Sequence, residues 1–162
     1  EVDAFYCSQH QCADSILSRK ILGLTVEYQG QLVDCYSCHI NLPNCEGDDQ
    51  LDNIRNIVER SQSRNLKILM GDFNTDAISD PNAYQKIKSL GLLDTFEMAE
   101  QKDSGITVEK AIDGWNGHSE EKRLDYIFLN QPKQVLSSQV IFNGKNKPVV
   151  SDHFGLDVEL IL

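Results

Sequence analysis

The chain is predicted to fold as a layered α/β protein, because β-type and helix-type segments follow one another along it. Two β-type runs, residues 21–28 and 31–39, are joined through Gln29-Gly30, which is a hairpin signal. A helix-type segment then leads into the apolar run 66–70, as in a right-handed crossover between parallel strands. A hairpin beside a crossover in one chain indicates layered α/β packing.

Two helices are expected from apolar residues that recur at helical spacing. The first covers residues 48–63, and the second begins at Asp80-Pro81 and runs to about Leu90, where Gly91 ends it. The apolar stripe of the first helix comprises Leu51, Ile54, Ile57 and Val58. The run 66–70 has the composition of a buried central strand, residues 100–121 that of a polar surface loop, and three further strands are expected at 124–129, 135–142 and 155–161.

The charge balance restricts the class of function. With 25 acidic and 15 basic residues the net charge is −10, which disfavours a large non-specific contact with nucleic acid. A compact phosphate site remains compatible with this charge, because a divalent cation inverts the local field. The chain has no apolar run of the roughly 20 residues that span a bilayer, so no membrane partner is expected.

The cysteines indicate a reducing compartment. Their number, five, is odd, which favours free thiols and a cytoplasmic protein. Strand alternation sends Cys35 and His39 to one face and Cys38 to the other, so a disulfide or shared metal between Cys35 and Cys38 is not expected.

Ionisable and amide side chains stand at the ends of the apolar strands, where α/β folds tend to place active sites. Asp72 and Asn74 follow the run 66–70, and Asp125 begins the run 124–129. Ser151-Asp152-His153 precedes the last strand, and His39 ends its own strand. Together these residues supply ligands for a hard cation, a base, a group that orients the base, and donors to phosphate.

Each residue alone also has a structural interpretation. Asp72, Asn74 and Asp152 are common turn and cap residues, and a single histidine is often structural. Asp125 can pair with Lys122 or Arg123. The ordered set favours catalysis over these separate explanations.

The motifs GDFN at 71–74, LDYIF at 124–128 and SDH at 151–153, in this order after His39, resemble the endonuclease/exonuclease/phosphatase superfamily, also called DNase I-like. The resemblance extends from about residue 15 to the C-terminal end of the chain. It implies a four-layer α/β sandwich, in which two facing mixed sheets are flanked by helices. It also implies hydrolysis of phosphoesters with Mg²⁺ or Mn²⁺.

The resemblance also implies roles for single residues. Asp72 would activate or position the attacking water, and Asn74 would hold that water or a phosphate oxygen. His153 would contact a phosphate oxygen or act as general base, and Asp125 would orient it. Asp152 would bind the metal, and His39 would donate to the phosphate.

The family also has an Asn and a metal-binding Glu in its N-terminal part, and no counterpart is visible in this sequence. Residues 1–162 are therefore expected to be the C-terminal part of one domain. The alternative to an active enzyme is a catalytically inactive fragment that binds a partner.

Within the family, the segments 107–125 and 37–45 resemble a bacterial subgroup associated with maltose 6′-phosphate phosphatase. A small sugar phosphate is accordingly the expected substrate, and Trp115 would stack on the sugar. The same tryptophan would equally well anchor its loop to the core. A nuclease or a sphingomyelinase-like phosphodiesterase remains the alternative activity, and the sequence leaves the oligomeric state open.

Overall fold

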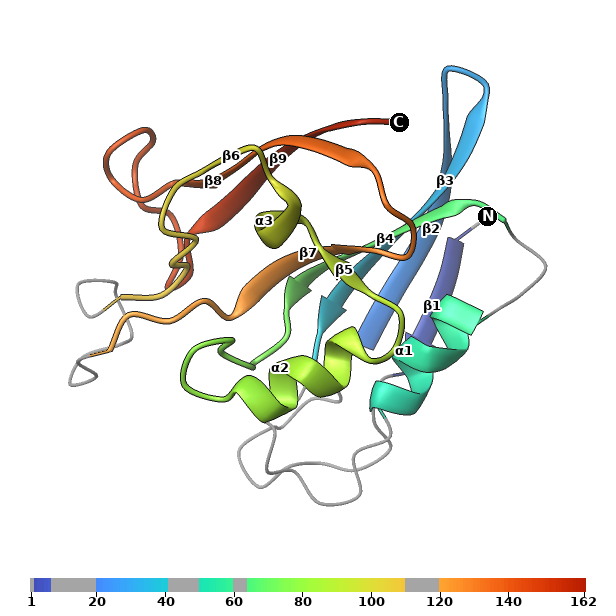
Figure 1. Cartoon of the computed structure of the whole chain (residues 1–162), viewed down its shortest axis with the longest axis horizontal. Coiled ribbons are helices and arrows are strands. Elements are labelled where there is room, and N and C mark those ends of the chain that lie inside the picture. Colours follow the sequence, from blue (N-terminus) through green and yellow to red (C-terminus); the bar gives the residue numbers. More distant parts are fainter. Residues whose placement is uncertain (1, 7–19, 41–49, 60–63, 110–119) are drawn as a thin grey trace.

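The computed structural model describes residues 2–6, 20–40, 50–59, 64–109 and 120–162 (Figure 1). Its elements are β1 Val2–Tyr6, β2 Lys20–Tyr28, β3 Gln31–His39, α1 Gln50–Glu59, β4 Leu66–Asp72, α2 Pro81–Lys88, β5 Leu93–Asp94, α3 Thr95–Met98, β6 Gln101–Lys102, β7 Asp125–Leu129, β8 Gln134–Ile141 and β9 Gly155–Ile161. A six-stranded sheet has the order β1-β2-β3-β4-β7-β5, and a three-stranded sheet has the order β6-β8-β9. β3–β4 and β6–β8 are parallel pairs and the others antiparallel, so both sheets are mixed, as predicted.

The predicted hairpin joins β2 to β3. Tyr28 pairs with Gln31, and the two residues between them both have positive φ, 50° at Gln29 and 78° at Gly30. Positive φ at both central positions matches the turn to the right-handed twist of the strands, and glycine adopts it without steric cost.

The predicted crossover runs from β3 through α1 to β4. Ile54 and Ile57 of α1 are fully buried against the sheet, which explains the helical spacing of apolar residues in this segment. The helix returns the chain parallel to β3, and β4 takes a central position with neighbours on both sides. The parallel register brings His39 opposite Asp72.

Gly71 lets β4 approach β3 closely at the end of both strands. Its φ is +133°, and a Cβ built there would lie 2.0 Å from the carbonyl oxygen of Cys38. Only glycine fits such a contact with a neighbouring backbone. The residue before Asp72 is therefore fixed by the geometry of the strand pair.

A helix-side core fills the space between the large sheet and the helices α1 and α2, which lie below this sheet in Figure 1. Asp80 caps α2 by accepting a hydrogen bond from the Ala83 backbone N–H at 3.2 Å, as the Asp-Pro start predicts. Burial of each large apolar side chain here contributes about 1.5–3 kcal/mol. The helix-side core comprises Ile21, Tyr36, Cys38, Ile40, Ile54, Ile57, Leu69, Phe73, Tyr84, Ile87, Leu92, Tyr126 and Phe128.

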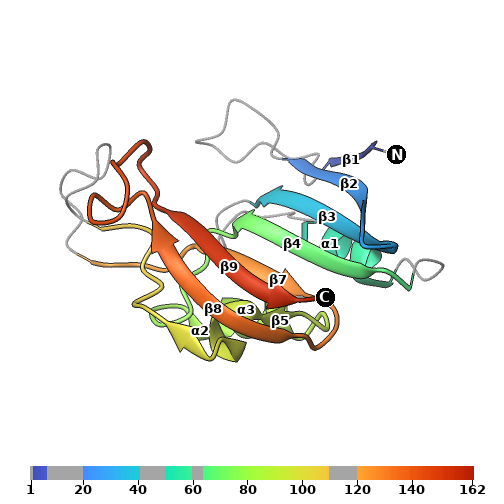
Figure 2. The same ribbon diagram turned by 90° about the horizontal axis from the view of Figure 1, so that it is seen from above.

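An inter-sheet core lies on the other face of the large sheet, where β8 and β9 pack (Figure 2). Its buried members are Val33, Leu66, Ala99, Leu129 and Val135, and Cys35, Ile68, Met98, Val158, Leu160 and Leu162 pack against them. The architecture is thus two facing mixed sheets with helices on the outer face of the larger one, in agreement with the predicted fold class.

The inter-sheet core does not extend over β2. Four apolar side chains on one face of this strand are exposed by 39–54%. They lie on the face that Val33 and Cys35 present to the inter-sheet core, because Val26 pairs with Val33 and Leu24 with Cys35. These four residues, here called the β2 stripe, are Leu22, Leu24, Val26 and Tyr28.

The prediction of an irregular surface loop over 100–121 is wrong in part. β6 pairs with β8, and Val108 forms a bridge with Lys122. Thr107 and Val108 are fully buried, which the polar composition around them concealed. The strand β1 and the short elements β5 and α3 were also not predicted, because two to five residues give too little periodicity to detect.

The two described cysteines face opposite ways, as predicted. Cys38 belongs to the helix-side core and Cys35 packs against the inter-sheet core. Cys7, Cys12 and Cys45 lie outside the described residues. None of the described helices has the length and apolar character needed to cross a membrane.

Candidate active site

Three of the candidate residues form one row across three neighbouring strands. His39 ends β3, Asp72 ends β4 and Asp125 begins β7; the strand register places His39 opposite Asp72 and Asp72 opposite Asp125. His153 comes from the loop before β9, which starts at the same end of the molecule (Figure 1). The sheet register therefore brings His39, Asp72 and Asp125 together, and the loop before β9 adds His153.

Asp72 is held by the turn that follows it. One carboxylate oxygen accepts a hydrogen bond from the Asn74 backbone N–H at 2.7 Å, and the other accepts from the Asn74 side chain at 3.2 Å. The Asn74 amide also donates to the carbonyl oxygen of Ile40 at 2.8 Å. Asn74 has φ +47°, a left-handed conformation that asparagine tolerates better than most residues. In this arrangement the amide N–H group of Asn74 fixes Asp72 and the end of β3.

His39 is the exposed member of the row. Its Nε2 lies 3.3 Å from Oδ2 of Asp72, and its side chain is 55% exposed, against 16% for Asp72. An exposed ring beside a partly buried carboxylate can reach a bound anion from the solvent side.

Asp125 and His153 form a direct pair. Oδ2 of Asp125 lies 2.8 Å from Nδ1 of His153, and the side chains are 17% and 21% exposed. An ionised carboxylate only accepts, so Nδ1 carries the proton and the lone pair of the neutral ring lies on Nε2. The contact expected between these two residues from the sequence is present.

The environment shifts the pKa values of His153 and Asp72. The hydrogen bond to Asp125 raises the pKa of His153 above its ordinary value; burial opposes this, and the charges of Asp125, Asp72 and Asp152 add to it. Burial raises the pKa of the Asp72 carboxyl, the Asn74 backbone hydrogen bond opposes this, and the nearby Asp125 charge raises it further. Two carboxylates close to a histidine therefore lower the cost of a positive charge in this site.

Asp72, Asp125 and His153 have the donor atoms for a metal ion. One ligand atom from each lies within 4.8 Å of the others. Carboxylate oxygens suit hard divalent ions, and an imidazole nitrogen is compatible with Mn²⁺. The donor set, with two carboxylates that repel one another, fits a divalent cation.

Two candidates stand apart from this group. Asp152 is exposed, accepts a hydrogen bond from the Ser151 hydroxyl at 3.0 Å, and is not among the three grouped residues. Trp115, the expected sugar platform, lies outside the described residues. The sequence-based role of each stays a prediction.

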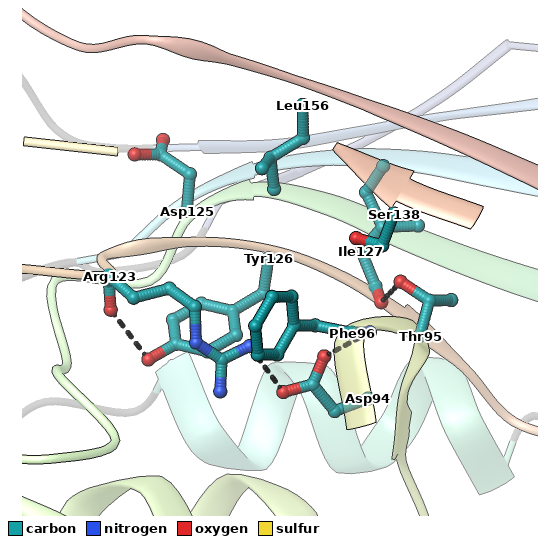
Figure 3. Close-up of a pocket in the computed structure, with 9 residues that line it drawn as sticks. All are labelled: Asp94, Thr95, Phe96, Arg123, Asp125, Tyr126, Ile127, Ser138 and Leu156. Carbon is teal, nitrogen blue, oxygen red and sulfur yellow. Dashed lines mark hydrogen bonds and ion pairs between the residues drawn. The ribbon is translucent and has the colours of Figure 1, made fainter. Parts of the chain in front are cut away.

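Arg123 does not pair with Asp125, contrary to the structural alternative considered from sequence. Its guanidinium bonds Asp94 at 2.6 Å on the other side of β7 from Asp125 (Figure 3). Buried Thr107 approaches the backbone N–H groups of Leu124 and Asp125 at 3.1 and 3.3 Å and so fixes the start of β7. Sequence reasoning missed these supports, although Arg123 directly precedes the LDYIF motif.

Comparison with known proteins gives a family for this chain. Residues 11–153 match the Endonuclease/Exonuclease/phosphatase family. No curated protein matches the sequence.

Solved structures share the fold. An endonuclease/exonuclease/phosphatase family protein from Leptotrichia buccalis is 54% identical, with a TM-score of 0.87 over 100% of this chain and 61% of its own. The mannosyl-6-phosphatase Bt3783 of Bacteroides thetaiotaomicron is 20% identical, with a TM-score of 0.78 over 100% of this chain and 66% of its own. D. rerio TDP2 in complex with a single-strand DNA product is 20% identical, with a TM-score of 0.68 over 100% of this chain and 67% of its own.

This chain thus spans 61% and 66% of the length of the first two structures. The family match covers most of the sequence, and it includes His39, the GDFN and LDYIF motifs and His153. The chain belongs to the endonuclease/exonuclease/phosphatase family.

Proposed function

We propose that the protein is a metal-dependent phosphoester hydrolase that acts on a small sugar phosphate. The observation that carries the hydrolase proposal is the grouping of Asp72, Asp125 and His153 at the strand ends. Family membership supports the same reaction class.

Asp72, His153 and His39 have different roles in an in-line displacement. Asp72, held by Asn74, positions the attacking water. His153, oriented by Asp125 through Nδ1, presents Nε2 to a phosphate oxygen or to the proton of the water. His39 donates to the phosphate as negative charge grows on it. Positioning and charge neutralisation account for most of the rate in phosphoryl transfer.

A divalent ion, Mg²⁺ or Mn²⁺, would be held by carboxylates of this site, with Asp152 as the ligand predicted from the sequence. When bound, such an ion neutralises charge on the phosphate and lowers the pKa of a bound water. The mutual repulsion of Asp72 and Asp125, which raises the pKa of Asp72, supports a cation between protein and substrate.

A sugar phosphate is favoured over DNA by charge. The net charge of −10 disfavours tracking along a polyanionic duplex. The fold likeness to a mannosyl-6-phosphatase and the resemblance of 107–125 to the maltose 6′-phosphate phosphatase subgroup support the same substrate class. The second candidate is a nuclease, which the fold likeness to a DNA-bound protein favours.

A substrate panel tests the proposal. The longest natural protein that contains this sequence is assayed with Mg²⁺ against sugar phosphates, abasic-site duplex DNA and sphingomyelin, with His153→Ala as the control. We expect phosphate release from a sugar phosphate to be the fastest reaction. Faster cleavage of abasic DNA would reassign the protein as a nuclease, and no turnover on any phosphoester would leave the inactive binding module.

A further inference from the structure

The hydroxyl of Tyr126 ties together the two segments that carry the candidate catalytic carboxylates. It lies 2.6 Å from the carbonyl oxygen of Thr75 and 2.7 Å from that of Arg123, and it accepts a hydrogen bond from the Ala77 backbone N–H at 3.1 Å. One hydroxyl has a single proton, so the two carbonyls share it. Its three contacts span the chain after Asp72 and the chain before Asp125.

Asp76 makes a second connection between the same two segments. Its Oδ1 accepts from the Arg123 backbone N–H at 3.3 Å, and its Oδ2 accepts from the Ser79 hydroxyl at 2.7 Å. Burial raises the pKa of Asp76, but its hydrogen bonds lower it by more, so this carboxylate stays ionised and both of its oxygens remain acceptors. Tyr126 and Asp76 thus add to the backbone hydrogen bond from the Phe73 N–H to the Leu124 carbonyl, 2.9 Å, which also joins the segment after Asp72 to the segment before Asp125.

The contacts of the Arg123 side chain fix the position of the Arg123 backbone. The guanidinium lies between the rings of Tyr126 and Phe96, at 4.5 and 4.6 Å from their centroids, and bonds Asp94 at 2.6 Å (Figure 3). A buried, planar guanidinium with an ion pair and two aromatic faces has little freedom. The Arg123 carbonyl that receives the Tyr126 hydroxyl is thereby fixed.

We propose that the Tyr126 hydroxyl is a positioning group for catalysis, which sets Asp72 and Asn74 against Asp125 without touching the substrate. This inference rests on the proposed phosphoester hydrolysis. Small displacements matter in such a site, because a misplacement of about 1 Å can reduce a rate by about 100-fold. The two carbonyls that the hydroxyl bonds lie close to the candidate site in the sequence: Thr75 follows Asn74 directly, and Arg123 precedes Asp125 by two positions.

Tyr84 provides a matched control within the same core. Its ring stacks on Tyr126 with centroids 5.7 Å apart, and the two residues are 3% and 1% exposed. The Tyr84 hydroxyl bonds Asp94 at 2.7 Å and Glu97 at 2.8 Å, neither of which belongs to the candidate site. Tyr84→Phe removes a buried hydroxyl that bonds Asp94, but it leaves in place both the hydrogen bonds of the Tyr126 hydroxyl and the ion pair between Arg123 and Asp94.

The experiment compares Tyr126→Phe, Tyr84→Phe and wild type in kcat, KM and melting temperature with the sugar phosphate that the panel identifies. We expect Tyr126→Phe to lose kcat by about 10-fold or more, as for other groups that orient catalytic residues, with KM within about 2-fold. Tyr84→Phe should keep kcat within about 2-fold, with a comparable fall in melting temperature. Equal kcat for both variants would overturn the inference and leave Tyr126 a structural residue.

Hydrogen exchange tests the same connection without an activity assay. The Asn74 backbone N–H, which bonds Asp72, should exchange faster in Tyr126→Phe than in Tyr84→Phe. An inactive wild type would refute only the proposed hydrolysis. An Asn74 N–H that exchanges no faster in Tyr126→Phe than in Tyr84→Phe would refute the positioning role. Should Tyr126→Phe not fold, Asp76→Asn replaces it, with the same expected loss of kcat and of Asn74 protection; wild-type values in that variant would overturn the inference.

Discussion

Replacement of Asp125 by asparagine isolates the orienting role of one carboxylate. The substitution keeps the shape of the side chain and removes a negative charge that lies 2.8 Å from Nδ1 of His153. The asparagine carbonyl oxygen can still accept from Nδ1–H, so the ring is not released. What is lost is the charge-assisted part of the hydrogen bond.

The size of the effect follows from the burial of the pair. With side chains only 17% and 21% exposed, the charge is weakly screened, and a hydrogen bond to a charged group is worth about 1.5–3 kcal/mol. At 1.36 kcal/mol per factor of ten, this range corresponds to a loss of roughly 10- to 100-fold in kcat. Because asparagine keeps an acceptor, we expect a value near the lower end.

The pH dependence tests the direction in which the pKa of His153 changes. Asp125 raises the pKa of His153, so Asp125→Asn should move the His153 titration to lower pH. The raised pKa also stabilises the wild-type fold: this contribution is fully present below 6.5, the ordinary value for histidine, and is lost as pH rises through the folded pKa. The variant should therefore lose more stability below pH 6.5 than above the folded pKa of wild-type His153.

The assay combines a kcat profile against pH with an NMR titration of the histidine ring, assigned by its absence in His153→Ala. Asp157→Asn removes an equal charge from the exposed face of β9 and serves as the control. A His153 titration that stays in place or moves to higher pH in Asp125→Asn would refute the reasoning. So would a loss of kcat larger than that of His153→Ala.

Three further substitutions, the last with a matched control, test catalysis, metal binding and backbone geometry. His153→Ala should lower kcat by about 100-fold or more without changing the melting temperature by more than a few degrees, because the ring contributes to the transition state more than to the core. Asp152→Ala should raise the Mg²⁺ concentration for half-maximal rate by about 10-fold or more, with part of the rate restored at high Mg²⁺; unchanged Mg²⁺ dependence would remove Asp152 as a ligand. Gly71→Ala should cost more than the 1–3 kcal/mol of a strained φ, because its Cβ would lie 2.0 Å from the Cys38 oxygen. Gly30→Ala, with φ +78° and no atom within 4 Å, should cost only about 1–2 kcal/mol in chemical denaturation, and equal costs would contradict the clash.

The sequence predicted the parts of the fold that leave a periodic or local signal. The hairpin at Gln29-Gly30, the helix capped by Asp80 and the central strand β4 each depend on a few neighbouring residues. The crossover between β3 and β4 was also expected, whereas the register that places His39 opposite Asp72 is seen only in the structure. These signals are local, so one sequence was enough to read them.

The supports of the site left no such signal. Arg123 finds its partner Asp94 across 29 positions of the chain, and Tyr126 reaches Thr75 across 51. The position of Arg123 two residues before Asp125 suggested a pair between them, but Arg123 precedes β7, and its side chain bonds Asp94 on the other side of the strand. Such contacts depend on the packing of the sheet against α2 and α3, which periodicity does not reveal.

The candidate site depends on the helix-side core more than on the inter-sheet core. Phe73 follows Asp72 and Tyr126 follows Asp125, and both rings are almost completely buried in the helix-side core, where they meet edge to face at 5.9 Å. The exposed β2 stripe belongs to the opposite face of the sheet, where the inter-sheet core ends. The apolar area of the β2 stripe that stays in water forgoes about 25 cal/mol of stabilisation for each Å². The strand register that aligns His39, Asp72 and Asp125 is instead held from the covered face of the sheet, where the helix-side core lies.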